Sequence, residues 1–85
     1  MSVRAEALRE RLERRFTPLE LSVEDEGHLH IGHANEGRGH FRVRIVAEAF
    51  RGVAPVARHR MVYAALEDLM ETDVHAIAIE AKAPS

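Results

Sequence analysis

The sequence contains no cysteine, and that absence excludes several kinds of site. Disulfides cannot form, and a zinc finger or an iron–sulfur site held only by thiolates of this chain is ruled out. Long apolar runs are also missing, since no segment is long enough to cross a bilayer. The N-terminus, MSVRAEALRERLERR, lacks the apolar stretch of a secretory signal and carries too many glutamates for a basic presequence. These absences predict a soluble, cytoplasmic protein that does not contact membranes.

An excess of charge of one sign is also lacking. The formal net charge of −2 argues against a strong general affinity for nucleic acid, although a local basic patch remains possible. The hydrophobic fraction of 46% is ordinary for a folded chain, so wholesale disorder is not expected. With 85 residues, no repeat and no linker, the chain predicts one domain spanning residues 1–85. We expect a core from about residue 5 to residue 82, followed by a frayed tail.

Histidine and glycine are concentrated in residues 27–41, GHLHIGHANEGRGHF, which hold four of the six histidines and four of the five glycines. Neutral imidazole offers a nitrogen lone pair near pH 7, and glycine lets a loop aim side chains at a common point. By itself the segment is equally compatible with a metal-related site and with a polar surface loop. Its histidines are His28, His30, His33 and His40.

The first predicted element is a helix that Ser2 caps and Pro18 stops. Charged side chains occupy most of its surface, and Glu10 and Arg14 form a favourable pair one turn apart. Its apolar residues recur at spacings of three and four and form one stripe: Ala5, Leu8, Leu12 and Phe16.

Two strands are predicted next. Residues 19–25 alternate, with Leu19, Leu21 and Val23 on one face, and residues 41–45 alternate in the same way after the histidine segment. Consecutive strands joined by a loop usually pair antiparallel. Their outward faces then match acidic with basic side chains, Glu20 and Glu24 against Arg42 and Arg44.

The second half of the chain predicts a helix and a third strand. The chain turns at Gly52 and Pro55, and a short helical turn over residues 53–57 precedes a helix that ends at residues 72–73. The buried stripe of this helix contains Val62, Leu66 and Leu69, with His59 on a similar side. Residues 74–80 then alternate as a strand, in which His75, Ile77 and Ile79 share one face.

This order, α-β-β-α-α-β, predicts an α+β fold with a small mixed three-stranded sheet and helices on one face. A strand, a crossover helix and a further strand form a right-handed parallel unit, so the second strand is central. Residues 27–39, His40 and His75 should therefore share one edge of the sheet, where adjacent strands are about 4.8 Å apart. That convergence favours a metal-related site. The expected core contains Leu8, Leu12, Leu21, Val43, Ile45, Val62, Leu66 and Ile77.

Several short motifs occur in a characteristic order. They are Asp25-Glu26, the histidine segment, His40-Phe41, Phe50-x-Gly52, Arg58-His59-Arg60-x-Val62-Tyr63 and Val74-His75-Ala76. In this combination the chain resembles the BolA family over nearly its whole length. It departs from the family pattern at Gly27, where a serine is frequent, and in ending soon after the third strand. The resemblance implies a KH-like fold of type II with a helix-turn-helix-like region at residues 52–63.

The resemblance also implies a function, as the partner of a monothiol glutaredoxin. In such complexes a 2Fe-2S cluster is bridged by the glutaredoxin cysteine, the glutathione cysteine and two ligands from the BolA-like protein. His75 matches one ligand. The other comes from the loop and is a histidine or cysteine according to subgroup, so this cysteine-free chain belongs with the histidine subgroup.

Within the loop, His30 best matches the ligand position, and His28 and His33 are substitutes. His40 is expected to support the site by hydrogen bonding. Cluster trafficking, assembly or iron sensing is therefore expected, and not enzymatic activity, because no nucleophile has a base partner and no recognised phosphate-binding loop is present. Alone, the chain should carry no cofactor and be a monomer or weak homodimer.

Two other hypotheses remain. The first is a DNA-binding transcriptional regulator in which Arg51, Arg58 and Arg60 contact phosphates. Residues 52–55 lack the GxxG loop of KH domains, and solvent exposure at the start of a helix explains Arg58 and Arg60 equally well. The second is a zinc-dependent hydrolase using the loop histidines, for which no placed carboxylate base is evident.

Overall fold

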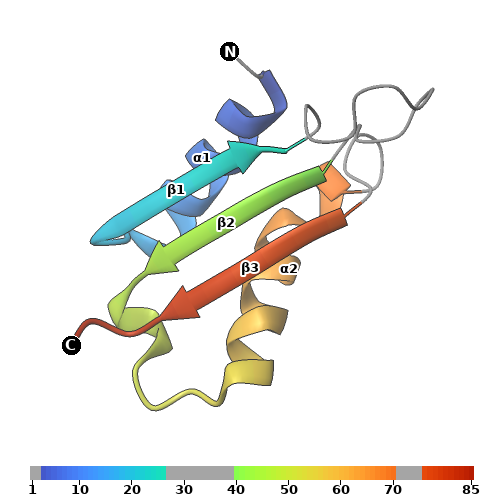
Figure 1. The fold of residues 1–85 in the computed structure, drawn as a ribbon. Helices are drawn as coiled ribbons and strands as arrows, with labels where there is room; N and C mark the ends of the chain where they lie inside the picture. The colour runs from blue at the N-terminus through green and yellow to red at the C-terminus, as the bar shows by residue number, and fades with distance from the viewer. Residues whose placement is uncertain (1–2, 27–39, 71–75) are drawn as a thin grey trace.

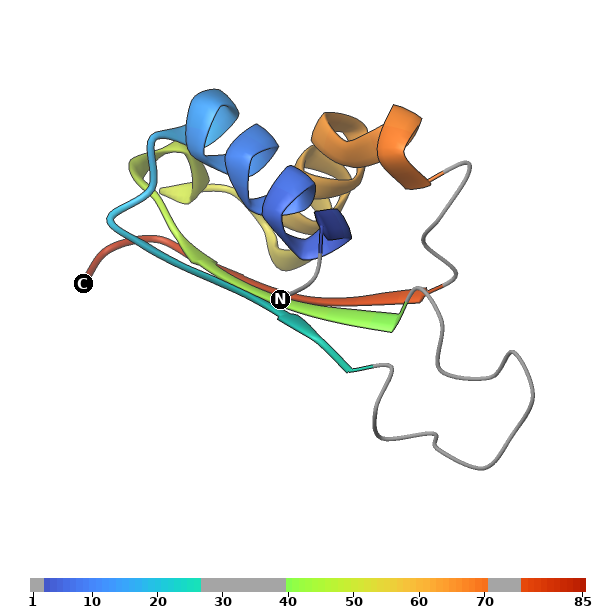
Figure 2. The same cartoon turned by 90° about the horizontal axis from the view of Figure 1, so that it is seen from above.

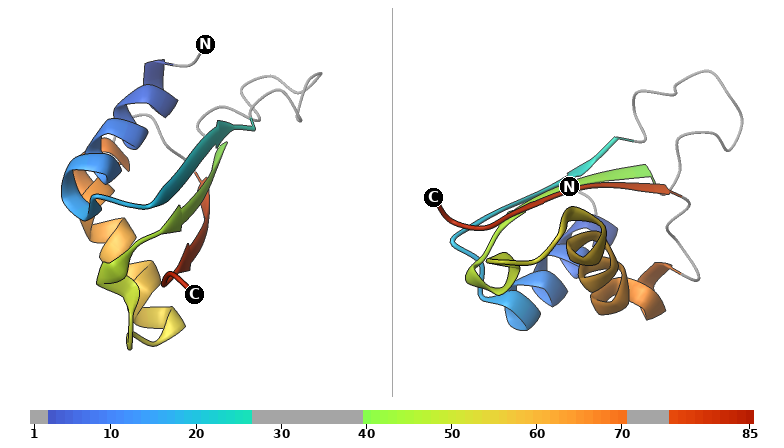
Figure 3. Two further views of the ribbon diagram at one scale, coloured as in Figure 1. Left: turned by 90° about the vertical axis from the view of Figure 1, so that its left-hand side faces the viewer. Right: turned by 90° about the horizontal axis from the view of Figure 1, so that it is seen from below.

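The structure is a computed structural model that describes residues 3–26, 40–70 and 76–85. Its sheet has the order β1-β2-β3, with β1 antiparallel and β3 parallel to the central β2. Both long helices cover one face of this sheet and leave the other bare (Figures 1, 2 and 3). The predicted sheet topology is therefore confirmed. In chain order the elements are α1 (Val3–Phe16), β1 (Glu20–Asp25), β2 (His40–Val46), the 3-10 turn η2 (Glu48–Phe50), α2 (Pro55–Met70) and β3 (Ala76–Lys82).

The core lies between the sheet and the helices. Along β2, Phe41, Val43 and Ile45 are buried, whereas Arg42 and Arg44 are exposed on the bare face, as the two-residue period of a strand requires. Seven of the eight expected core residues are buried: Leu8, Leu12, Val43, Ile45, Val62, Leu66 and Ile77. Leu21 is only half-buried, because it lies on the edge strand β1. The core also contains Phe41, which was predicted on the same strand face as Val43 and Ile45, and Ala47, Phe50 and Ala65, which were not predicted.

Helix α1 follows its predicted pattern. Leu8 and Leu12 are buried in the core, and Ala5 and Phe16 pack against it. The helix ends at Phe16, and Thr17 then takes a positive φ of 45° while its N–H donates to the carbonyl oxygen of Glu13. The predicted pair of Glu10 and Arg14 is present at 2.9 Å, whereas the predicted cap, Ser2, lies outside the described residues.

The predicted match of outward charges is confirmed in part, and two further ion pairs are present. Glu24 is directly opposite Arg42 in the register, but Arg42 Nε donates to Glu26, the diagonal neighbour, at 2.9 Å. Arg44 pairs with Glu80 of β3 at 3.8 Å and not with β1, because β2 has a neighbour on each side. Leu19, predicted to share the core face, precedes the strand and is 69% exposed.

The short helical turn was predicted at the wrong place. It is η2, Glu48–Phe50, where the buried Phe50 ring lies 5.2 Å from that of Phe16. Gly52 then turns the chain with a φ of 76°, a conformation that glycine adopts without steric cost, and α2 begins at Pro55.

Two further predictions about the second half need correction. His59 does not share the buried side of α2 but is exposed and stacks on Tyr63. Strand β3 does not end at Glu80 but extends to Lys82, whose carbonyl accepts the N–H of Ala47 at 3.0 Å. The predicted end of the helix at residues 72–73 and the start of the strand at residues 74–75 lie outside the described residues.

Candidate functional site

One edge of the sheet gathers the ends of three strands. Strand β1 ends there, and the N–H of Glu26 donates to the carbonyl oxygen of His40 at 2.8 Å. Strands β2 and β3 both begin there, and their parallel register pairs His40 with Ala76. Residues from three separate parts of the sequence therefore meet at this edge (Figure 1), which we call the histidine edge.

His40 is the one predicted site histidine of this edge that the described residues include. It is half-buried and, since Phe41 points into the core, it belongs to the bare face of the sheet. His28, His30, His33 and His75 lie outside the described residues, so their convergence stays a prediction. Their neighbours in sequence, Glu26, His40 and Ala76, do lie together as expected.

The histidine edge carries an ion pair. Arg42 follows His40 on the same face of β2, and its guanidinium contacts Glu26, whose side chain is 21% exposed. The hydrogen bond that Arg42 donates to this carboxylate raises the pKa of Arg42 above its ordinary value. In the part of the chain that the structure describes, no three metal-ligating side chains are close enough to hold a metal ion.

The arginines of the nucleic-acid hypothesis have other partners. Arg51 donates to both carboxylate oxygens of Glu48, at 2.7 and 2.8 Å, and to the carbonyl of Pro84 at 3.1 Å. Glu48 thereby raises the pKa of Arg51. Arg58 is half-buried and donates to backbone carbonyls, so the expectation that it is merely exposed is wrong. Arg60 is exposed on α2.

Sequence reasoning missed Arg11. Its side chain crosses from α1 to α2, where it donates to the carbonyl of Ala65 at 2.9 Å and to both oxygens of Asp68 at 2.6 and 3.0 Å. The guanidinium lowers the pKa of Asp68 below its ordinary value. A separation of 57 residues left no local signal by which the pair could have been found.

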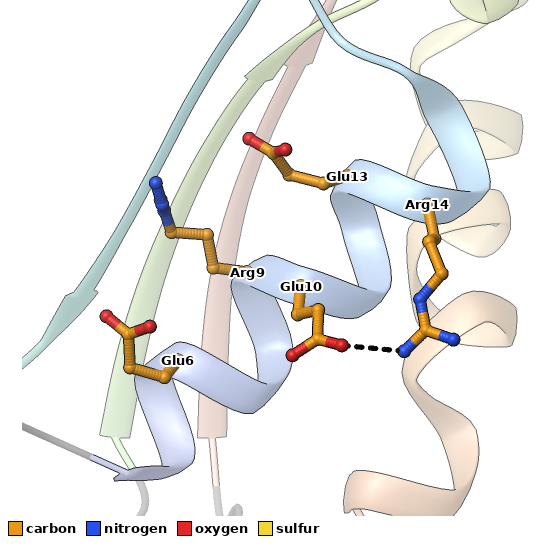
Figure 4. Close-up of a pocket in the computed structure, with 5 residues that line it drawn as sticks. All are labelled: Glu6, Arg9, Glu10, Glu13 and Arg14. Atoms are coloured by element: carbon orange, nitrogen blue, oxygen red, sulfur yellow. Dashed lines mark hydrogen bonds and ion pairs between the residues drawn. The ribbon is translucent and has the colours of Figure 1, made fainter.

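The outer side of α1 is hollowed between charged side chains, but it has none of the predicted site residues. Figure 4 shows carboxylates and guanidinium groups standing away from the helix, with one ion pair between Glu10 and Arg14. This supports the prediction of a solvated, charged face. The residues that line the hollow are Glu6, Arg9, Glu10, Glu13 and Arg14.

Neither described helix is long and apolar enough to span a membrane.

Comparison with known proteins gives consistent matches. The family model described as BolA-like protein matches residues 12–85. Protein BOLA1, chloroplastic, of Arabidopsis thaliana is 42% identical over 87 residues, which cover 96% of this chain and 54% of that protein. SufE-like protein 1, chloroplastic/mitochondrial, of the same plant is 42% identical over 85 residues, covering 92% of this chain and 23% of that protein. The chain thus spans about half or less of these two relatives.

The fold has close counterparts among solved structures. The BolA domain of SufE1 from Arabidopsis thaliana superposes with a TM-score of 0.88 and 43% identity, covering 99% of this chain and 95% of that one. BolA1 from the same plant superposes with a TM-score of 0.85 and 37% identity over the same shares. These similarities extend to the whole arrangement of helices and strands.

Proposed function

The chain belongs to the BolA-like family, and from that membership we propose that it is a non-catalytic partner of a monothiol glutaredoxin. In this proposal the two proteins and glutathione hold a bridging 2Fe-2S cluster, to which this chain contributes histidines. Its role is in iron–sulfur cluster trafficking or assembly, or in iron sensing. We also propose that it works in the cytoplasm and is a monomer or weak homodimer when alone.

The observation that carries the proposal is the parallel pairing of β2 with β3. It places His40 beside Ala76 at the histidine edge. His75 is the residue before Ala76, and residues 27–39 connect Glu26 to His40. Both sequence segments that supply the proposed ligands are therefore joined to the same edge, as a shared site requires.

The roles of the histidines follow from their match to the family motifs. We assign the ligand positions to His75 and to His30, with His28 and His33 as substitutes for His30. His40 would support the ligands by hydrogen bonding, since outer groups commonly orient metal-bound imidazoles.

The donor chemistry of the chain fits this cargo. The absence of cysteine leaves imidazole as the donor with the best affinity for iron, and histidines replace thiolates on one iron of Rieske centres. Such ligation raises the reduction potential. Neutral imidazole can also be displaced by protonation, which suits a protein that hands its cluster on.

The proposal is tested by reconstituting the complex. The purified chain is mixed with a monothiol glutaredoxin, glutathione, iron and sulfide, and visible absorption and circular dichroism are compared with those of glutaredoxin alone. We expect a distinct heterodimer spectrum that His75→Ala abolishes. His30→Ala should lose only part of it, because His28 and His33 lie nearby in the sequence.

A matched control is His59→Ala, which removes an exposed imidazole from α2 near the opposite end of β3. It should leave the spectrum intact. Calorimetry of the two proteins without iron measures docking separately, so that loss of a ligand is distinguished from loss of the complex. An unchanged spectrum in the His75→Ala complex would reject the proposed ligand set.

The alternative of DNA binding gains no support from the described residues. Arg51 and Arg58 donate to groups within the chain, so a phosphate would have to compete with Glu48 and with backbone carbonyls. Arg51 and Arg60 are both exposed, and Arg60 lies on α2. Transcriptional regulation therefore stays a prediction from the sequence.

A further inference from the structure

An open three-stranded sheet has two outer strands, here β1 and β3, and each has backbone groups that no neighbouring strand in the described part of the chain pairs with. On β3 these groups point away from β2. The carbonyl of Lys82 bonds to Ala47, next to β2, whereas the carbonyls of Ala81 and Ile77 bond to side chains of α2. The backbone groups of successive residues point to alternate sides of a parallel strand. The backbone N–H and C=O of Ile79 therefore also point away from β2. Such an edge is a template for pairing with another chain.

Helix α2 supplies two side chains that cap this edge. Arg58 Nη1 donates to the carbonyl of Ala81 at 3.2 Å, and its Nε donates to the carbonyl of Val53 at 2.6 Å. The second bond fixes the guanidinium in place. Further along the strand, the hydroxyl of Tyr63 lies 3.5 Å from the carbonyl of Ile77. Both ends of the outward-facing row are thus occupied.

Side chains of α2 also line the space beside β3. A groove of about 310 Å³ runs between the start of α2 and residues 79–82, and Pro55, Arg58 and His59 line its helical side. The ring of His59 stacks on that of Tyr63 with 5.2 Å between centroids. A strand that approached β3 would have to displace this row of side chains.

The outer strands β1 and β3 differ in the charges that they would bring together on pairing with the same strand of a second copy. Edge strand β1 has the sequence ELSVED, so pairing with itself would bring like charges together. Strand β3 has the sequence AIAIEAK, with isoleucine, small alanines and both Glu80 and Lys82. In an antiparallel pair of β3 strands, opposite charges can meet, so β3 is the edge that a second copy would use.

We propose that Arg58 and Tyr63 close the edge of β3 against strand addition by a second copy of this chain. An N–H group from a new strand would have to compete with Arg58 and Tyr63 for the carbonyls of Ala81 and Ile77, and α2 side chains line the space that the strand would enter. The isolated chain is thereby kept monomeric.

The test is the oligomeric state of Arg58→Met, which keeps the length of the side chain and removes its donors. We expect sedimentation velocity to show a monomer for the parent chain and a doubled mass for the variant at the same concentration. The amides of Ile79 and Ala81 should gain protection from hydrogen exchange as concentration rises. The control, Arg60→Met, removes an exposed charge from the same helix and should remain monomeric.

A second variant, Tyr63→Ser, keeps the proposal testable if Arg58→Met does not fold. Tyr63 is 38% exposed, so Tyr63→Ser opens the other end of the edge with little effect on the core. If circular dichroism shows Arg58→Met to be unfolded, Tyr63→Ser decides the question. The proposal is overturned if the folded variants stay monomeric, or if Arg60→Met associates equally. It is also overturned if the parent chain is a dimer in which the amides of Ile79 and Ala81 are protected.

Discussion

Among single residues, Arg11 shows how a side chain on a charged helix can act over a long distance in the sequence. It lies next to Leu12 on α1, close enough to the core for its guanidinium to reach Asp68 and the carbonyl of Ala65 on α2. Its neighbours Glu10 and Arg14 pair within one turn, as the sequence predicted. The local pair could be predicted because it depends on helix period alone, whereas the partner of Arg11 depends on how α1 and α2 pack.

Removing Arg11 should change the ionisation of Asp68. In the native protein the pKa of Asp68 is lowered, first by the hydrogen bond from Arg11. The stabilisation is therefore present above the ordinary aspartate pKa and is lost as pH falls through the lowered one. In Arg11→Met we expect the pKa of Asp68 to rise towards its ordinary value of about 3.9. An NMR titration of the carboxyl carbon measures it.

The control for this titration is Arg14→Met, which removes an arginine from the same helix and breaks only the pair with Glu10. It should leave the Asp68 carboxyl unchanged. If Asp68 titrates alike in the parent chain and in Arg11→Met, the ion pair between the helices does not persist in solution.

Whole elements were predictable where their pattern is periodic. The stripe of α1 and the alternation of β2 follow directly from the spacing of apolar residues, and the structure buries the residues expected. Prediction failed where tertiary contacts decide the conformation. The 3-10 turn at Glu48–Phe50 depends on Phe50 packing against Phe16, and the extension of β3 to Lys82 depends on a bond from Ala47.

Helix α2 should owe much of its stability to Leu66, which is fully buried beneath the sheet together with Val62 and Ala65. Truncation of such a side chain removes transfer free energy and leaves a cavity. We expect Leu66→Ala to lower the free energy of unfolding by about 2–5 kcal/mol. Chemical denaturation measures the loss, with the exposed Leu19→Ala as the matched control of the same chemistry. A loss below about 1 kcal/mol would mean that the helix packs elsewhere.

Considered as one molecule, the protein has a topology that could be derived from the order of its elements. Antiparallel pairing of consecutive strands and parallel pairing across a strand–helix–strand unit together make β2 central and bring His40 beside the start of β3. The chemistry of the histidine edge could be predicted less fully, because sequence identifies donors but does not select which loop histidine binds. The role of Arg58 could not be predicted, since its acceptors on Val53 and Ala81 become neighbours only in the folded chain.

The pairing of β2 with β3 also has a consequence for the order of folding. Each residue of β2 meets a partner 36 positions later, from His40 with Ala76 to Val46 with Lys82. The entropy of closing so long a loop must be lost before these contacts contribute, whereas α2 forms from local contacts. We therefore expect Leu66→Ala to slow folding, and Ile77→Ala to act mainly by accelerating unfolding.

Stopped-flow measurements of both variants over a range of denaturant separate the two effects. Equal slowing of folding by Ile77→Ala would show that β3 is already paired in the transition state. If the expected order holds, β3 is the last strand to join the sheet, and the histidine edge is complete only after β3 has paired with β2. Nascent or refolding chains would then acquire α2 before they acquire the site.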